Sequence, residues 1–117
     1  MELDAQEIKR LMKEAIREEI GYSDCRIAKK WKDGIMTLNS DNPSIQPKEI
    51  PIDSFFKKLT SVREKLRVLE QKLNNHKTLS PEEKLEFQTL ISRAYGSLTT
   101  FNILFEDEED RFVGVKG

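Results

Sequence analysis

The stretch FFKKLTSVREKLRVLEQKL, residues 55–73, sets the pattern from which the rest of the fold follows. Its apolar side chains recur at alternating intervals of four and three residues, which is the heptad spacing of a helix with one apolar seam. Asp53 or Ser54 is placed to cap the start of this helix. We predict a helix over residues 53–75, with a seam formed by Phe55, Leu59, Val62, Leu66, Leu69 and Leu73.

A second segment of the same kind follows a short polar stretch. Ser80 is a typical N-cap, Pro81 suits the first helical position and Glu83 completes a capping box. Because a loop of roughly five residues joins two seams of similar length, we expect an antiparallel helical hairpin. Its second helix is predicted over residues 81–105, with a seam formed by Phe87, Ile91, Ala94, Leu98, Phe101 and Phe105.

The stretch RAYGSLTTFN, residues 93–102, is unusual for the interior of a helix, because it is rich in glycine and hydroxyl residues. Small residues let another backbone approach closely, so we interpret it as a crossing point on a continuous helix, with Trp31 or a Phe as the filler. Two alternatives stay open for residues 93–105. One is a kink at Gly96 and Ser97, and the other is a strand, because apolar residues alternate from Tyr95 onward.

The first half of the chain is more mixed. Prolines 43, 47 and 51 predict a loop over residues 40–52, with room for a short edge strand at 49–52. Asp33-Gly34 is a hairpin-turn signal, and we predict a β-hairpin over residues 25–39. Helical spacing of apolar residues after Asp4 predicts an amphipathic helix over residues 5–20.

These elements predict an α+β, mostly α fold in a single domain over residues 1–117. The N-terminal helix and the β-hairpin are expected to pack on the long antiparallel helical hairpin. Such a hairpin resembles a short coiled coil.

Charge is abundant but nearly balanced. Charged residues make up 35% of the 117 residues and the net charge is −1, which argues against a protein whose whole surface attracts nucleic acid. Residues 51–77 carry seven Lys or Arg against three Asp or Glu, a net +4. Residues 106–117 carry two against five, a net −3, and we interpret them as a solvated acidic tail that folds back toward Lys57 and Lys58.

The sequence contains little that suggests catalysis. His76 is the one histidine and falls in the predicted loop between the long helices, and Cys25 is the one cysteine, so no internal disulfide can form. Motifs of phosphate-binding loops, nucleophile elbows and zinc proteases do not occur. We therefore predict a protein that is not an enzyme, with no catalytic residue, metal site or cofactor.

The chain starts MELDAQEIKR, which is acidic and lacks the apolar run of a signal peptide, and no stretch is long and apolar enough for a membrane span. A cytoplasmic location without a membrane partner is the expectation.

Two surfaces are candidates for binding. Apolar residues that flank the seams predict an interface for a homodimer or for another protein, and we select Phe56, Val68, Leu90, Tyr95, Ile103 and Leu104. The alternative is nucleic-acid binding by basic residues around an aromatic ring, supported by the basic helix, with contacts from Arg26, Lys29, Lys30, Trp31 and Lys32. The same basic residues could instead protect an edge strand whose Trp31 lies in the core. The first hypothesis, a non-enzymatic interaction or self-association module, is preferred.

Four stretches resemble a small family of uncharacterised bacterial proteins: WKDGIMTL, QPKEIPIDSFF, VREKLRVLEQKLN and YGSLTTFNILF. The similarity covers roughly residues 25–114, which is nearly everything except the N-terminal helix. It implies a bacterial cytoplasmic setting and no particular activity, cofactor or site residue.

Overall fold

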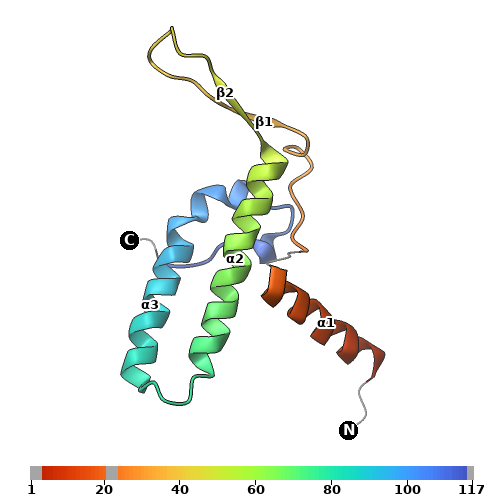
Figure 1. The fold of residues 1–117 in the computed structure, drawn as a ribbon, viewed down its shortest axis with the longest axis vertical. Coiled ribbons are helices and arrows are strands. Elements are labelled where there is room, and N and C mark those ends of the chain that lie inside the picture. The colour runs from red at the N-terminus through yellow and green to blue at the C-terminus, as the bar shows by residue number, and fades with distance from the viewer. Residues whose placement is uncertain (1–3, 21–23, 116–117) are drawn as a thin grey trace.

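The computed structural model describes residues 4–20 and 24–115, and for residues 16–20 it describes the backbone (Figure 1). Helices predominate and two strands pair in one small sheet, which confirms the α+β, mostly α class. The α-helices are α1 (Ala5–Ile20), α2 (Ile52–Asn74) and α3 (Pro81–Ser97). The strands are β1 (Ile35–Leu38) and β2 (Lys48–Pro51), and two 3-10 helices follow as η1 (Thr99–Leu104) and η2 (Glu108–Asp110).

A β-hairpin between α1 and α2 is present as predicted, but the predicted bounds, residues 25–39, are wrong. β1 pairs antiparallel with β2 in a register that places Ile35 opposite Pro51. The second strand therefore lies in the stretch 40–52, close to the short edge strand for which the prediction left room at 49–52. Upstream of Asp33 the chain turns instead of extending, because the Ala28 carbonyl accepts hydrogen bonds from the Trp31 and Lys32 amides. Asp33 itself has a φ of 63°, which makes it a turn residue.

The segment that was expected to be the first strand pairs with a distant part of the chain. Ile27 forms an antiparallel bridge with Phe105, and the Ala28 amide donates to the Leu104 carbonyl at 2.7 Å. The Glu106 amide donates to the Arg26 carbonyl at 2.9 Å. These bonds use the backbone groups that a local hairpin would have needed.

The start of α3 is as predicted. The Glu83 amide donates to Ser80 Oγ and the Ser80 amide donates to Glu83 Oε1, both at 3.1 Å, so the capping box is complete. These bonds lower the pKa of the Glu83 carboxyl, because they favour its charged form.

The continuous helix predicted as far as residue 105 is wrong. α3 ends at Ser97, Leu98 leaves the helical region with φ −101° and ψ 1°, and η1 continues at a new angle. Ser97 Oγ donates to the Arg93 carbonyl, and Thr99 Oγ1 donates to the Gly96 carbonyl. Hydroxyls that occupy backbone carbonyls favour the end of a helix. The kinked-helix alternative is therefore the closest one, and a strand over 93–105 is wrong.

The small residues of α3 do mark a crossing point, but the crossing segment is the C-terminal one rather than Trp31 or a Phe. A Cβ added to Gly114 would lie 2.6 Å from the Gly96 nitrogen and 2.8 Å from Tyr95 Cβ. The Val115 amide donates to Ser92 Oγ at 3.2 Å. Glycine at position 114 therefore permits its backbone to touch that of α3.

Residues 106–115, here called the C-terminal segment, are not the solvated acidic tail of the prediction. Phe112 is buried, and its backbone amide and carbonyl both bind the Asn102 side chain, at 2.6 and 2.9 Å. The acidic residues reach other cations than the predicted Lys57 and Lys58. The Asp110 carbonyl accepts from Arg63 Nε at 2.8 Å, and the Asp107 carboxylate binds Arg26.

The core is where α2, η1 and the C-terminal segment meet. Phe105 is its centre, with 1% of its surface exposed and with edge-on ring contacts to Phe56 and Phe112 at 5.2 and 5.5 Å. Arg63 and Glu64 are buried beside it and paired at 2.7 Å. The core cluster consists of Ile52, Phe56, Leu59, Leu104, Phe105 and Phe112.

Candidate interaction surface

The six residues selected as an interface divide into three groups. Phe56 and Leu104 lie in the core and are buried, so their selection as surface contacts is wrong. Val68 and Tyr95 are half-buried, and burial together with the nearby Glu70 carboxylate raises the pKa of the Tyr95 phenol. Leu90 and Ile103 are exposed.

One side of the α2–α3 hairpin has large apolar side chains in solvent. Val62 and Leu69 of α2 are 46% and 51% exposed, and Phe87 and Leu90 of α3 are 39% and 57% exposed. Leu66 lies between them on α2 and is half-buried. We call these five residues the open face.

Helix geometry places both halves of the open face on one side of the hairpin. Residues two apart in a helix point about 200° apart. Val62 therefore points away from the buried Glu64, whose partner Arg63 holds the C-terminal segment. Leu90 points away from Ser92, which also binds that segment. The C-terminal segment covers one side of the hairpin, and the open face is the other side.

Sequence reasoning missed Val62, Leu69 and Phe87 as surface residues, although all three lay in the predicted seams. The heptad pattern identified the apolar side of α2, but not which part of that side would be covered. The buried stripe of α2 runs through Ile52, Phe56, Leu59 and Arg63, so it is rotated relative to the seam and leaves part of the seam uncovered.

The apolar face of α1 is also uncovered, contrary to the prediction that this helix packs on the hairpin. This face consists of Ile8, Leu11 and Met12, which are 45%, 43% and 59% exposed. Figure 1 shows that α1 approaches α2 with its C-terminal end, while its N-terminal end points away from the body. Asp4 caps the helix through the Glu7 amide at 2.7 Å, so the helix has its own start signal.

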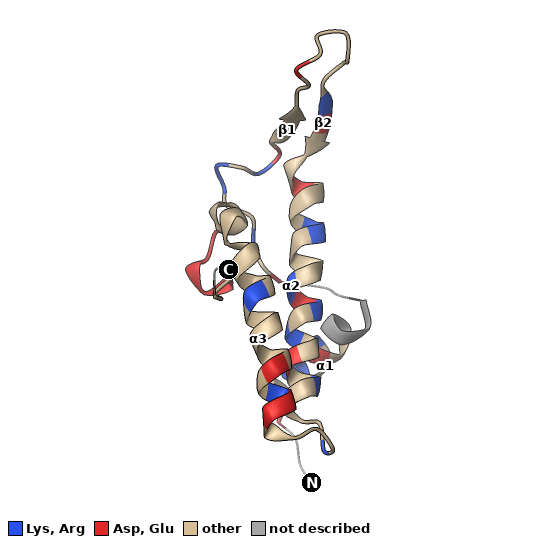
Figure 2. Ribbon diagram, turned by 90° about the vertical axis from the view of Figure 1, so that its left-hand side faces the viewer, with Lys and Arg blue, Asp and Glu red and all other residues tan. Residues whose placement is uncertain are grey.

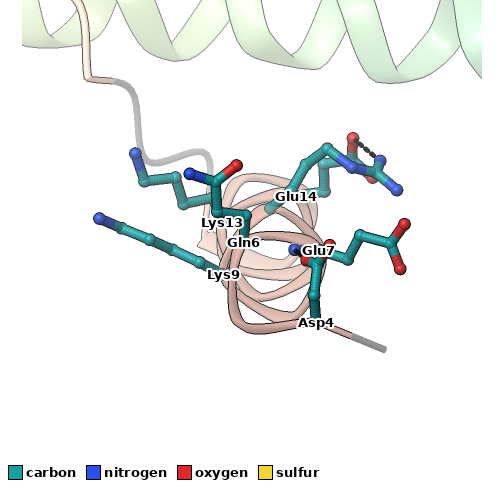
Figure 3. A pocket seen from close by; sticks show the side chains of 7 residues that line it. Asp4, Gln6, Glu7, Lys9, Lys13 and Glu14 are labelled. Atoms are coloured by element: carbon teal, nitrogen blue, oxygen red, sulfur yellow. Dashed lines mark hydrogen bonds and ion pairs between the residues drawn. The ribbon is translucent and has the colours of Figure 1, made fainter. Parts of the chain in front are cut away.

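A hollow beside α1 is lined by the polar side chains of that helix (Figure 3). Gln6, Lys13 and Glu14 lie on the side that faces α2. Glu14 pairs with Arg10 at 3.0 Å, one helical turn earlier. Such alternating charges are typical of the solvated side of an amphipathic helix, so the hollow does not suggest a substrate site.

The whole molecule exposes more surface than a compact chain of its size. Its accessible surface is 9162 Å², whereas a 13.7 kDa monomer is expected to expose about 6,600 Å². Its radius of gyration is 18.0 Å, against about 13 Å for a compact domain. The β1–β2 arm and α1 both extend from the body, which accounts for the shape (Figure 1).

The basic segment, residues 26–32, was the alternative candidate. Trp31 is half-buried, its indole Nε1 donates to the Ile103 carbonyl at 3.0 Å, and the Lys30 ammonium lies 5.5 Å from its ring centre. The Lys29 side chain and Lys32 are exposed, but the Lys29 amide binds the Glu106 carboxylate. Acidic residues of the C-terminal segment therefore adjoin the basic ones, and Figure 2 shows that red cluster beside the body.

Arg26 and Asp107 form an ion pair between these two segments. Arg26 donates to both carboxylate oxygens of Asp107, at 2.7 and 3.0 Å. These hydrogen bonds lower the pKa of the Asp107 carboxyl below its ordinary value of 3.8, and they raise the pKa of the Arg26 guanidinium. The pair ties the N-terminal end of the basic segment to the C-terminal segment.

We predict that Asp107→Asn makes the melting temperature depend less on pH in the acid range. Because the folded carboxyl has a lowered pKa, its contribution is present above the ordinary value of 3.8 and is lost as the pH falls through the folded value. The melting temperature of the variant should be lower than that of the wild type at pH 7, and the difference between the two should be smaller at pH 3. Thermal melts at both pH values measure this, with Glu109→Gln as the neighbouring control. An equal gap at both pH values would contradict the prediction.

The remaining candidates for chemistry have structural explanations. His76 Nδ1 lies 3.3 Å from the Thr78 and Leu79 amides, so it organises the loop between α2 and α3. Cys25 is half-buried and packs against the core. Within residues 4–20 and 24–115, no group of His, Cys, Asp and Glu is arranged to hold a metal ion. In the same ranges no helix is both long and apolar enough to cross a membrane.

Comparison with known proteins gives one match. No curated protein and no solved structure matches the chain. A family model matches residues 22–111, which contain every described helix and strand except α1. This agrees with the resemblance of the sequence to an uncharacterised family. The chain belongs to the family described as a domain of unknown function, DUF8685.

Proposed function

We propose that this protein is a non-enzymatic module that self-associates through the open face. The observation that carries the proposal is the exposure of Val62, Leu69, Phe87 and Leu90 together on one side of the α2–α3 hairpin. Scattered apolar residues are normal on a protein surface, whereas a group that spans two adjacent helices is typical of an interface.

The accessible surface supports the same proposal. The difference between 9162 Å² and the roughly 6,600 Å² expected of a compact monomer exceeds the ~800 Å² that each partner buries in an interface of standard size. A chain with this much surplus surface can bury a full interface and still expose as much as a compact protein. Two identical chains would do so most simply as a two-fold dimer.

Nucleic-acid binding by the basic segment has less support. Arg26 is paired with Asp107, and the Trp31 ring has Lys30 beside it and the Ile103 carbonyl on its N–H group. Phosphate contacts need cations that are free of competing carboxylates, and base stacking needs an accessible ring. Retention of the wild type on single-stranded nucleic acid, with steep weakening by salt and loss in Trp31→Ala, would favour this alternative.

The test of self-association is the molar mass by light scattering after size exclusion, at low and high salt. We expect the wild type, with a chain mass of 13.7 kDa, to elute as a dimer at both salts, because an apolar interface is insensitive to screening. The Leu69→Lys, Leu90→Lys double variant should be a monomer, since it places charges in the centre of the interface.

The control for that variant is Leu85→Lys. Leu85 is 68% exposed on α3 but points about 140° away from Leu90, so it lies off the open face. It should leave the dimer intact. A wild type that is monomeric over a hundredfold range of concentration would overturn the proposal, and so would a double variant with the mass of the wild type.

We also propose a bacterial cytoplasmic setting. A lone cysteine suits a reducing compartment, and the sequence resembles an uncharacterised bacterial family. Fractionation of cells that express the chain from its own gene would test this.

A further inference from the structure

Two apolar surfaces of this chain lie in solvent at the same time: the apolar face of α1, formed by Ile8, Leu11 and Met12, and the open face of the hairpin. We propose that α1 of one chain docks on the open face of a second copy, and that the second copy returns the same contact. This inference rests on the proposed self-association and names the segment that covers the open face.

Each of the two surfaces is a row of apolar side chains along one side of a helix. Ile8, Leu11 and Met12 are spaced by three and one residues and fall on one side of α1, over a little more than one turn. Val62, Leu66 and Leu69 are spaced by four and three and fall on one side of α2. If α1 lay over the open face, between α2 and α3, its apolar side chains would pack against residues of both helices.

The charges that border the two surfaces are complementary. Glu7 and Glu14 border the apolar face of α1 on one side, and Lys9 borders it on the other. Lys58 and Lys65 are exposed along the α2 edge of the open face. Glu86 is exposed along its α3 edge, with Arg93 about two turns further along the same edge. Figure 2 shows the blue residues along α2 and the red ones toward the N-terminal end of α3.

This pattern selects one orientation of the docked helix. When α1 runs antiparallel to α2, its glutamates lie over the α2 lysines and Lys9 lies over the Glu86 edge. In the opposite orientation Lys9 would lie over the α2 lysines, and the α1 glutamates would lie over Glu86. Like charges across an interface disfavour the wrong arrangement more than matched charges strengthen the right one.

The position of α1 in its own chain favours an exchange between chains. Within one chain α1 turns polar side chains toward α2, as Figure 3 shows for Gln6, Lys13 and Glu14, and its apolar face stays in solvent. The family match covers residues 22–111, so α1 lies outside the matched part of the chain. A reciprocal exchange covers the apolar face of α1 and the open face in both chains, which is the closed solution for a two-fold dimer.

The first test compares two lysine substitutions on the same exposed helix. Met12→Lys places a charge on the apolar face of α1, whereas Gln6→Lys places the same charge on its polar side. We expect Met12→Lys to raise the dimer dissociation constant about 100-fold, because both copies of the contact are damaged, and Gln6→Lys to change it less than about twofold. Sedimentation equilibrium measures both values, and far-UV circular dichroism at equal concentration checks that both variants are folded.

The outcomes separate this inference from the proposed function. A wild type that stays monomeric overturns self-association and the exchange with it. If Met12→Lys dimerises as tightly as the wild type, the exchange alone is overturned. The open face would then be covered by some other part of the second copy. Loss of the dimer in Met12→Lys and not in Gln6→Lys supports the exchange.

The second test places the contact by cross-linking. In a Cys25→Ser background, a chain that carries Met12→Cys is mixed with a chain that carries Leu90→Cys, and a short bismaleimide is added. A covalent heterodimer is expected, because the antiparallel orientation points Met12 toward α3 of the other copy. A chain that carries both cysteines should likewise yield covalent dimers. Monomers cross-linked internally would show that α1 docks on its own hairpin and would overturn the exchange.

Discussion

Phe105→Ala is expected to lower the free energy of unfolding by about 3–5 kcal/mol, which is the usual cost of truncating a fully buried Phe. Phe105 has 1% of its surface exposed and contacts the rings of Phe56 and Phe112 edge-on. Its backbone also pairs with Ile27, so it joins α2, the basic segment and the C-terminal segment. Removing the ring leaves a cavity that none of these segments can fill without giving up another contact.

Urea denaturation followed by circular dichroism measures the loss. Ile103→Ala is the matched control, because Ile103 lies two residues away in η1 with 60% of its surface exposed, and it should cost less than about 1 kcal/mol. Because the loss approaches the whole stability of a small domain, Phe105→Leu provides a milder variant, with an expected cost of about 1 kcal/mol. Equal losses in Phe105→Ala and Ile103→Ala would show that the core is not centred on this ring.

Gly114→Ala is expected to cost about 3 kcal/mol, although it adds a single methyl group near the end of the chain. The new Cβ would overlap the Ser92 carbonyl oxygen and would lie 2.6 Å from the Gly96 nitrogen. Both are backbone atoms of α3, so they cannot move aside as the end of a long side chain could. The C-terminal segment must therefore lift from α3, and the buried Phe112 ring is displaced with it.

Thermal unfolding gives the size of this effect, and hydrogen exchange of residues 106–115 shows where it acts. We expect faster exchange at the Phe112 amide, whose bond to Asn102 Oδ1 depends on a seated segment. Val113→Ala is the control, because that neighbour is 84% exposed and its side chain can be shortened at little cost. If Gly114→Ala melts together with Val113→Ala, the two backbones are not in close contact.

Local signals predicted the helices well. The capping box of Ser80 and Glu83 placed the start of α3, and the carboxylate of Asp4 placed the start of α1. α2 begins one residue before the predicted range and ends one residue before its predicted end. Each of these features depends on residues within about one helical turn of one another, which is the range over which a sequence pattern acts directly.

The hairpin shows where local signals fail. Asp33 does occupy a turn, with a positive φ, but the residues before it bond to Leu104 and Glu106, more than seventy positions away. A turn signal indicates where the chain changes direction and carries no information on which strand will pair after the turn. β1 therefore pairs with β2, which follows the proline-containing loop after β1.

The sequence by itself determined that the chain forms three amphipathic helices and that two of them make a hairpin, because periodicity and capping act between near neighbours. Tertiary structure alone decided which side of each helix is covered. The C-terminal segment packs where Gly114 lets its backbone touch that of α3, so Arg63 and Glu64 are buried while Val62 and Leu69 stay in solvent. Burial depends on contacts between segments from distant parts of the chain. The heptad seams could therefore be predicted from the sequence, whereas the segments that cover each helix could not.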